Sequence, residues 1–146
     1  MKNRKANNGG AIYFKNAISN SNINATYINN TAELDGGANW FFDSVSGSNV
    51  SGTYINNTAE RDGGANYFDS VSGSNVSGTY INNTAKRYGG ANSFFDRVSD
   101  SNIGGIYINS TASSSAIIYF MVYFNAILTN VTIENAIFLN NNYNES

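Results

Sequence analysis

The chain has no cysteine, no histidine and no proline among its 146 residues. Without cysteine it has neither a disulfide framework nor a thiolate metal site. Without histidine it lacks the commonest general base and the commonest zinc ligand. Only 12% of the residues are charged and the net charge is -2, so we expect little attraction to nucleic acid or to an anionic membrane. These absences argue against a nucleic-acid partner and against many catalytic and metal sites.

Long hydrophobic runs are also scarce. The N-terminal stretch MKNRKANNGGAIYF contains no apolar segment of signal-peptide length. The most apolar run, residues 116–128, contains Asn125 and is shorter than the roughly 20 residues that a spanning helix needs. We therefore expect buried strands in that run, no membrane span, and no signal peptide in this chain.

Asparagine is the commonest residue instead, and 41% of the chain is hydrophobic. The apolar content argues against disorder. Gly-Gly-Ala triplets begin at Gly9, Gly36, Gly63 and Gly89, so their spacing is nearly constant and shortens by one at the last step. The stretch 44–59 also recurs identically as 70–85. A period of this length indicates a repeat architecture.

The content of the repeat selects the architecture. Its Asn, Gly, Ser, Thr, Tyr and Val residues favour turns and strands over helices. A propeller blade needs about 40 residues, leucine-rich repeats need more leucine than this chain has, and the period is not a multiple of the hexapeptide on which a left-handed β-helix is built. Because crossovers between parallel strands are right-handed, we predict an all-β fold, a right-handed parallel β-helix of about five coils.

The coils follow the triplets. We expect residues 1–8 to be an N-terminal partial coil or tail, the coils to span 9–35, 36–62, 63–88, 89–113 and 114–142, and 143–146 to be a tail. In the last coil, 114–116 would take the Gly-Gly-Ala position and 138–142 the position of YINNT. Since a triplet comes almost at the start, we expect the chain to be part of a longer repeat protein.

Within coil two, we expect an aromatic strand in 36–43, a turn and short strand around Val50, a third strand in 53–59 and an exposed turn at 60–62. Coil three lacks one residue in its aromatic strand, which accounts for the shorter last spacing. Equivalent residues of stacked coils lie about 4.8 Å apart and form columns. We favour an inward tyrosine column over an inward isoleucine column, and we expect an asparagine ladder. The columns are Tyr27, Tyr54, Tyr80, Tyr107; Ile28, Ile55, Ile81, Ile108; and Asn29, Asn56, Asn82, Asn109.

The motifs GGAIYF at 9–14, YINNTA at 27–32, 54–59 and 80–85, and NVTIENAIFLNNN at 130–142 resemble the repeats of chlamydial polymorphic membrane proteins and of adhesin-like surface proteins of methanogenic archaea. The resemblance covers about residues 9–142 and implies a cell-surface or secreted right-handed β-helix that acts as an adhesin. Coils two to four depart from it, because they carry Asn39, Asn66 and Asn92 where the family often has isoleucine.

Three aspartates follow the aromatic strands: Asp43, Asp69 and Asp96. Stacked carboxylates could bind Ca²⁺ or serve a glycosidase, which needs a carboxyl pair about 5–10 Å apart. We favour solvated turns, because a site needs convergent polar groups in a pocket. We likewise expect Arg61 and Arg87 to neutralise neighbouring acids. No residue is therefore assigned as catalytic, cofactor-binding or metal-binding, and no cofactor is expected.

Two further features of the sequence, the glycosylation sequons and the threonine columns, suggest surface chemistry. Sequons occur at Asn24, Asn29, Asn49, Asn56, Asn75, Asn82, Asn109, Asn130 and Asn144 and would accept glycans in an exported protein, except where an inward ladder asparagine could not be modified. Threonines also form a column at 31, 58, 84 and 111. A threonine column is typical of ice binding only when a second one runs beside it. The neighbouring column at 26, 53 and 79 is interrupted by Ile106, so we do not expect ice binding.

The sequence thus favours a non-enzymatic, adhesin-like structural or binding module from a cell surface. Its expected partners are carbohydrate or another cell-surface protein, together with copies of itself through open coil ends. The alternatives are a fragment of a carbohydrate-active enzyme, such as a polysaccharide lyase or hydrolase, on the same fold, and a non-functional fragment of a longer adhesin.

Overall fold

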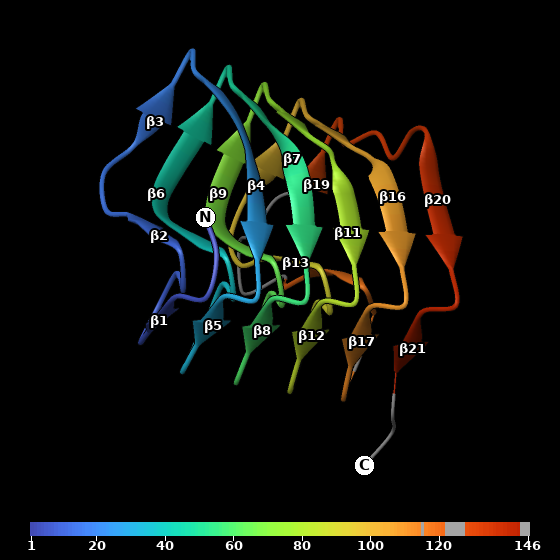
Figure 1. Cartoon of the computed structure of the whole chain (residues 1–146). Helices are drawn as coiled ribbons and strands as arrows, with labels where there is room; N and C mark the ends of the chain where they lie inside the picture. The colour runs from blue at the N-terminus through green and yellow to red at the C-terminus, as the bar shows by residue number, and fades with distance from the viewer. Residues whose placement is uncertain (115, 122–127, 144–146) are drawn as a thin grey trace.

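The computed structural model describes residues 1–114, 116–121 and 128–143, and every regular element in them is a β-strand. The strands form three parallel sheets that wind about one axis with about five coils (Figure 1). The chain is a right-handed parallel β-helix, as the repeat predicts. Figure 1 shows the coils advancing along the axis from the N-terminal to the C-terminal end.

Each coil visits the three sheets in the same order. The first, which we call the aromatic sheet, contains β2 (Ile12–Phe14), β3 (Ile18–Ser19), β6 (Asn39–Ser46), β9 (Asn66–Ser72), β13 (Asn92–Phe94), β14 (Val98–Ser99), β18 (Ile118–Phe120) and β19 (Leu128–Thr129). The tyrosine sheet contains β4 (Asn22–Ile28), β7 (Asn49–Ile55), β10 (Asn75–Val76), β11 (Thr79–Ile81), β15 (Asn102–Ile103), β16 (Gly105–Ile108) and β20 (Ala136–Leu139). The short-strand sheet contains β1 (Lys5–Ala6), β5 (Thr31–Ala32), β8 (Thr58–Ala59), β12 (Thr84–Ala85), β17 (Thr111–Ala112) and β21 (Asn142–Tyr143).

A corner divides the third strand that the sequence predicts. In coil two, Tyr54 and Ile55 end β7 in the tyrosine sheet, whereas Thr58 and Ala59 form β8 in the short-strand sheet. The prediction of one strand over 53–59 was therefore wrong. Asn56 makes the corner with a φ of 54°, a left-handed conformation that asparagine adopts more readily than most residues other than glycine. Asn29, Asn82 and Asn109 make the same corner in the other coils.

The tyrosine column points inward, as the sequence analysis favours. Tyr27, Tyr54, Tyr80 and Tyr107 are buried, and successive rings stack with centroids 4.9, 4.8 and 4.7 Å apart. The equivalent isoleucines are half-buried. Burial raises the pKa of the tyrosine hydroxyls above its usual value, because the charged phenolate would lose its solvation. The column is thus a continuous apolar and aromatic core.

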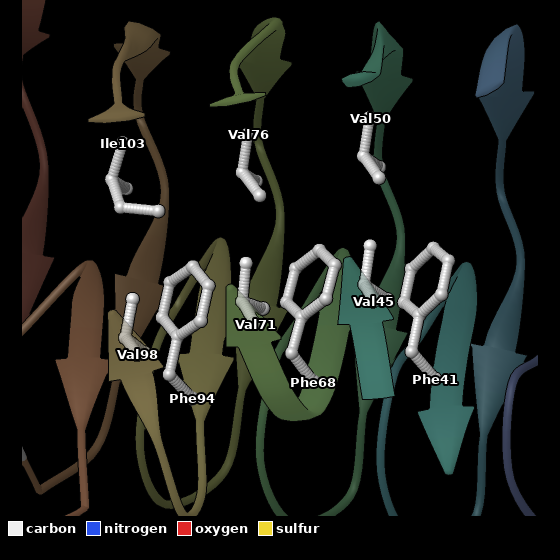
Figure 2. Packing of buried hydrophobic residues seen from close by; sticks show 9 residues of the cluster. All are labelled: Phe41, Val45, Val50, Phe68, Val71, Val76, Phe94, Val98 and Ile103. Atoms are coloured by element: carbon white, nitrogen blue, oxygen red, sulfur yellow. The ribbon is translucent and has the colours of Figure 1, made fainter. Parts of the chain in front are cut away.

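A second core lies between the aromatic and tyrosine sheets. Figure 2 shows its repeating unit of one phenylalanine and two β-branched residues per coil: Phe41, Val45, Val50; Phe68, Val71, Val76; and Phe94, Val98, Ile103. Phe41 and Phe68 stack at 4.5 Å, and Phe68 and Phe94 at 4.9 Å. Burial of each large apolar side chain contributes roughly 1.5–3 kcal/mol. The repeat therefore specifies the core as well as the period.

The asparagine ladder lies one residue later than predicted. The corner asparagines are exposed, whereas Asn30, Asn57 and Asn83 are fully buried. The Asn30 amide Nδ2 donates to Asn57 Oδ1 at 2.9 Å, and Asn57 Nδ2 donates to Asn83 Oδ1 at 3.0 Å. The corner turns the first asparagine of each pair outward and the second inward. The prediction of a ladder is therefore confirmed, but its position was wrong.

A second buried ladder explains why coils two to four carry asparagine after Gly-Gly-Ala. Asn39 Nδ2 donates to Asn66 Oδ1, and Asn66 Nδ2 donates to Asn92 Oδ1, each at 3.0 Å. The ladder does not extend into coil one, where Ile12 lies beside Asn39. The chain therefore replaces an apolar column by a hydrogen-bonded one in three successive coils.

The one-residue slip of coil three is confirmed. Asn39 pairs with Asn66, and Val45 pairs with Val71. The partners in the second pair are therefore separated by one residue fewer in the sequence than the partners in the first. The difference arises because the register shifts between Phe41 and Ser44. The extra residue of coil two is thus accommodated inside the aromatic strand, and the rest of the coil stays in register.

The last coil agrees with the prediction in one part and differs in another. Phe138 and Leu139 pair with Tyr107 and Ile108, so 138–142 takes the YINNT position as expected. The expected alignment of 114–116 with the Gly-Gly-Ala triplet is displaced by one position. Ile117, and not residue 116, lies beside Ala91, the last residue of the triplet in coil four. Ser115 lies outside the described residues. No helix suited to crossing a membrane is found in the described parts of the chain.

Candidate functional surface

An exposed group of aromatic side chains lies on the outer face of the aromatic sheet. Strand alternation points Phe41 into the core and its neighbours Trp40 and Phe42 outward. Tyr13 stacks on Trp40 at 4.8 Å, and Phe42 meets both rings edge-on at 5.9 and 5.2 Å. We call Tyr13, Trp40, Phe42, Tyr67 and Phe95 the aromatic patch.

The aromatic patch is exposed to solvent at its N-terminal side and becomes buried toward the middle of the solenoid. Tyr13 is 43% exposed and Phe42 49% exposed, whereas Tyr67 is 6% exposed. The Trp40 indole nitrogen is buried and has no hydrogen-bond partner in the described part of the chain. Ser93 interrupts the aromatic column, since it lies beside Tyr67 in the register. The accessible part is therefore the corner formed by Tyr13, Trp40 and Phe42.

The three candidate aspartates lie along the edge of this patch. The expectation that they occupy turns after the aromatic strands was wrong for Asp43 and Asp69, which lie within β6 and β9. The Asp96 backbone N–H donates to the Asp69 carbonyl at 2.9 Å, so these two residues are neighbours. Asp43 lies in the register shift of β6, where its Oδ1 accepts the Ser44 N–H at 2.7 Å. Burial, followed by repulsion from Asp96 and Asp43, raises the pKa of the Asp69 carboxyl. The structure thus brings the three carboxylates near one another despite the slip.

These aspartates do not form a recognisable metal site. Among the described residues, no group of three or more histidine, cysteine, aspartate or glutamate side chains has an arrangement that could hold a metal ion. Asp43 and Asp96 are exposed and Asp69 is half-buried. The arrangement offers carboxylate oxygens as hydrogen-bond acceptors beside aromatic rings.

A different pair of carboxylates is fully buried and was not singled out from the sequence. Asp35 and Asp62 are each 1% exposed. Arg61 Nε donates to Asp35 Oδ1 at 2.8 Å, and Arg87 Nε donates to Asp62 Oδ1 at 2.9 Å, and a second nitrogen of each arginine binds the other carboxylate oxygen. The prediction that Arg61 and Arg87 neutralise neighbouring acids is confirmed. The sequence did contain a signal for these pairs: an aspartate precedes Gly-Gly in two coils, and an arginine follows one coil later in each case.

These pairs tie successive coils together. Each arginine reaches the aspartate of the preceding coil, and the Asp62 N–H also donates to Asp35 Oδ1 at 3.3 Å. The hydrogen bond to Asp35 is the main cause that raises the pKa of the Arg61 guanidinium. Burial, with Asp35 and Asp62 nearby, raises the pKa of the Tyr67 hydroxyl. The buried carboxylates therefore act as structural acceptors next to the aromatic patch.

The sequons and threonine columns lie on outward positions. The placed sequon asparagines are exposed or half-buried, and none belongs to the buried ladders; Asn144 lies outside the described residues. The expectation that the corner asparagines would point inward, and so escape modification, was wrong. Thr31, Thr58, Thr84 and Thr111 lie in register, and Ile106 interrupts the second column beside Thr79.

Comparison with known proteins gives no relative. No protein-family model, no curated protein and no solved structure matches the chain.

Proposed function

We propose that the chain is a non-enzymatic, adhesin-like binding module of a cell surface, and that it holds carbohydrate against the aromatic patch. The observation that carries this proposal is the exposed corner of Tyr13, Trp40 and Phe42 on a rigid stack of coils. Contiguous exposed apolar side chains on a soluble fold mark interaction surfaces. Aromatic rings offer flat apolar area, and fixed side chains lose little entropy when a ligand binds.

The polar surroundings suit a sugar. A pyranose combines an apolar face, which packs on a ring, with hydroxyl groups that need acceptors and donors. The carboxylates of Asp43, Asp69 and Asp96 supply acceptors along one edge of the patch, and the exposed Lys15, which precedes Phe42 by one coil, supplies a donor. The carboxylates recur in three successive coils beside the patch, which supports an extended ligand such as an oligosaccharide over a small molecule.

The cell-surface setting rests on the resemblance of the GGA and YINNT repeats to adhesin-like proteins. The chain would then be one segment of a longer repeat protein, carrying part of an extended binding face. Carbohydrate or another cell-surface protein would be the partner.

The second candidate is a fragment of a carbohydrate-active enzyme. One observation favours it: Asp69 has a raised carboxyl pKa and lies beside two other carboxylates at the edge of an aromatic surface. Raised carboxyl pKa values are found at general acids. We rank this second, because Asp43 and Asp96 are exposed and the described hollow lies at the N-terminal end rather than over these aspartates.

The test is a glycan-array screen with the folded chain, with and without Ca²⁺. We expect saturable binding to a subset of glycans, and a loss of at least tenfold in affinity for Tyr13→Ala combined with Phe42→Ala. Ile106→Ala is the matched control, since Ile106 is 37% exposed on the tyrosine sheet. No binding, or equal binding by the patch variant, would reject the proposal. Cleavage of a bound oligosaccharide that Asp69→Asn abolishes would establish the enzyme instead.

A further inference from the structure

The two end faces of the solenoid are edges of parallel sheets (Figure 1). At the N-terminal face β2 and β3 pair with β6, and β4 pairs with β7; at the C-terminal face β18, β19 and β20 pair with β13, β14 and β16. Over most of their length these edge strands pair on one side only within the described residues. Unpaired backbone groups on such an edge can pair with another chain.

The edge strands of the two faces match position by position. β2 and β18 carry the same tripeptide, Ile-Tyr-Phe. β3 reads Ile-Ser and β19 reads Leu-Thr. The end of β4, at 25–28, reads Ala-Thr-Tyr-Ile, and β20 reads Ala-Ile-Phe-Leu. One further step of the stack, from the last coil of one copy to the first coil of another, would therefore place like residues side by side.

Such a step would extend both aromatic columns. Phe120 stacks on Phe94 at 4.9 Å, and Phe14 stacks on Phe41 at 4.6 Å, so they are the two ends of one column. Phe138 continues the tyrosine column from Tyr107 at 4.9 Å and is 49% exposed. In such a stack, Tyr27 of the second copy would pack on Phe138 and continue the tyrosine column.

Residues 1–8 stand in the way of this contact. Lys2 pairs with Ile28 and β1 pairs with β5, so the segment lies one level beyond the first coil. It is held by a Lys5–Glu33 ion pair at 3.1 Å. Backbone hydrogen bonds join it to Ile28, Thr31, Glu33 and Leu34, and further hydrogen bonds join it to the side chains of Asn29 and Asn30 and, through the Asn8 side chain, to the Asp35 N–H. Its side chains are mostly exposed, and a hollow of about 660 Å³ remains where it meets the first coil. In the stack, the end of β20 and β21 of the other copy would occupy the same place.

We propose that copies of this chain stack head to tail, and that residues 1–8 are a displaceable cap that the last coil of a second copy replaces. The occupant is a second copy because its C-terminal edge reproduces the residue order of the N-terminal edge. Such a contact is heterologous and does not close on itself, so it generates open chains of molecules. This inference concerns the 146-residue chain by itself and is independent of carbohydrate binding by the aromatic patch.

The orientation can be trapped, because the chain contains no cysteine. Ser19 and Thr129 are exposed and equivalent on the two end faces. Their Cα atoms would lie about 4.8 Å apart at a head-to-tail junction, within the range for a disulfide. We expect a mixture of Ser19→Cys chains and mass-tagged Thr129→Cys chains to form mainly the mixed dimer under mild oxidation. Ser46→Cys, in the same column but inside the stack, replaces Ser19→Cys as the control and should not react. Only like-with-like dimers, or no crosslink at high concentration, would overturn the proposal.

The cap is tested by locking it. Lys5 and Thr31 are register partners, so Lys5→Cys with Thr31→Cys should form an internal disulfide that holds β1 on β5. We expect the oxidised variant to sediment as a monomer and the reduced variant to associate with rising concentration. Thr58→Cys with Thr84→Cys, register partners inside the stack, should associate in both states. Equal association of the locked and reduced cap variants would show that residues 1–8 do not block the contact.

Discussion

At the scale of the residue, asparagine has two different structural roles in adjacent positions. Asn56 turns the chain with a left-handed φ and is exposed, whereas Asn57 is buried and hydrogen-bonded to the coils on both sides. The repeat YINN therefore encodes a corner followed by a ladder rung. The two roles predict different responses to substitution.

Asn57→Ala should lower the free energy of unfolding by about 3 kcal/mol, since it leaves buried polar groups without partners. Asn57 Oδ1 accepts hydrogen bonds from the backbone N–H and from the side-chain Nδ2 of Asn30. The Asn57 Nδ2 also donates to the backbone carbonyl of Tyr27 at 3.1 Å. Denaturant unfolding monitored by circular dichroism measures the change. Asn56→Gly is the control and should cost only a few tenths of a kcal/mol, because glycine adopts the same φ. A larger loss for Asn56→Gly would contradict the assignment of the two roles.

The raised pKa of Asp69 predicts a pH dependence of stability. A carboxyl group with a folded pKa above its unfolded value destabilises the fold when it is ionised, and this penalty disappears as pH falls through the folded pKa. Asp69→Asn should therefore have a higher Tm than the unaltered chain at pH 7, and the difference should vanish near pH 3. Thermal melts at both pH values, at low and high salt, provide the measurement. A lower Tm of Asp69→Asn at pH 7 would show that contacts of the carboxylate stabilise the fold by more than its burial and its acidic neighbours destabilise it.

At the scale of the element, the sequence predicted the coils better than their corners. The Gly-Gly-Ala spacing, the aromatic strand and the slip of coil three are properties of the repeat and appear directly in the register. The corner at Asn56 depends on one φ angle, which alternation of side chains does not reveal. Because the corner was missed, the ladder was assigned to Asn56 and not to Asn57. The Arg61–Asp35 pair, in contrast, needed only the stacking of coils to be anticipated.

The aromatic patch was only partly predictable. Alternation around Phe41 puts Trp40 and Phe42 on one outward face once the coil is known. Tyr67 and Ser93 are buried although they lie in the same column as the accessible Tyr13 and Trp40, and the period of the repeat does not specify this difference. The sequence therefore indicated an aromatic side, and the structure located its accessible corner at coils one and two.

The Gly-Gly turn is set by close contact between coils. A Cβ atom on Gly37 would lie 2.1 Å from the Gly64 carbonyl oxygen, which is backbone and cannot rotate away. Gly37→Ala should therefore destabilise the chain by more than about 3 kcal/mol or prevent folding. Gly73→Asn is the control, since the nearest atom to a Cβ there is 3.9 Å away and asparagine tolerates its φ of 55°. Circular dichroism and denaturant melts would compare them; equal stability of the two variants would contradict close packing at Gly37.

At the scale of the whole molecule, each coil contacts only its neighbours. Stability in such arrays is approximately a sum of coil terms and interface terms. A coil inside the stack has two interfaces and an end coil has one, so the same substitution should cost more in the middle than at an end. The phenylalanine column allows this comparison with one residue type.

Phe68 stacks on Phe41 and Phe94, at 4.5 and 4.9 Å, and is fully buried. Phe14 stacks only on Phe41, at 4.6 Å, within the described residues, and is half-buried. Phe68→Ala should cost about 3–5 kcal/mol, and Phe14→Ala about half as much. Denaturant unfolding at low protein concentration, where copies do not stack, gives both values. If the head-to-tail contact forms, raising the concentration should increase the cost of Phe14→Ala toward that of Phe68→Ala, because Phe14 then gains a second neighbour. A cost that is equal at low concentration would mean that the coils unfold without regard to their place in the stack.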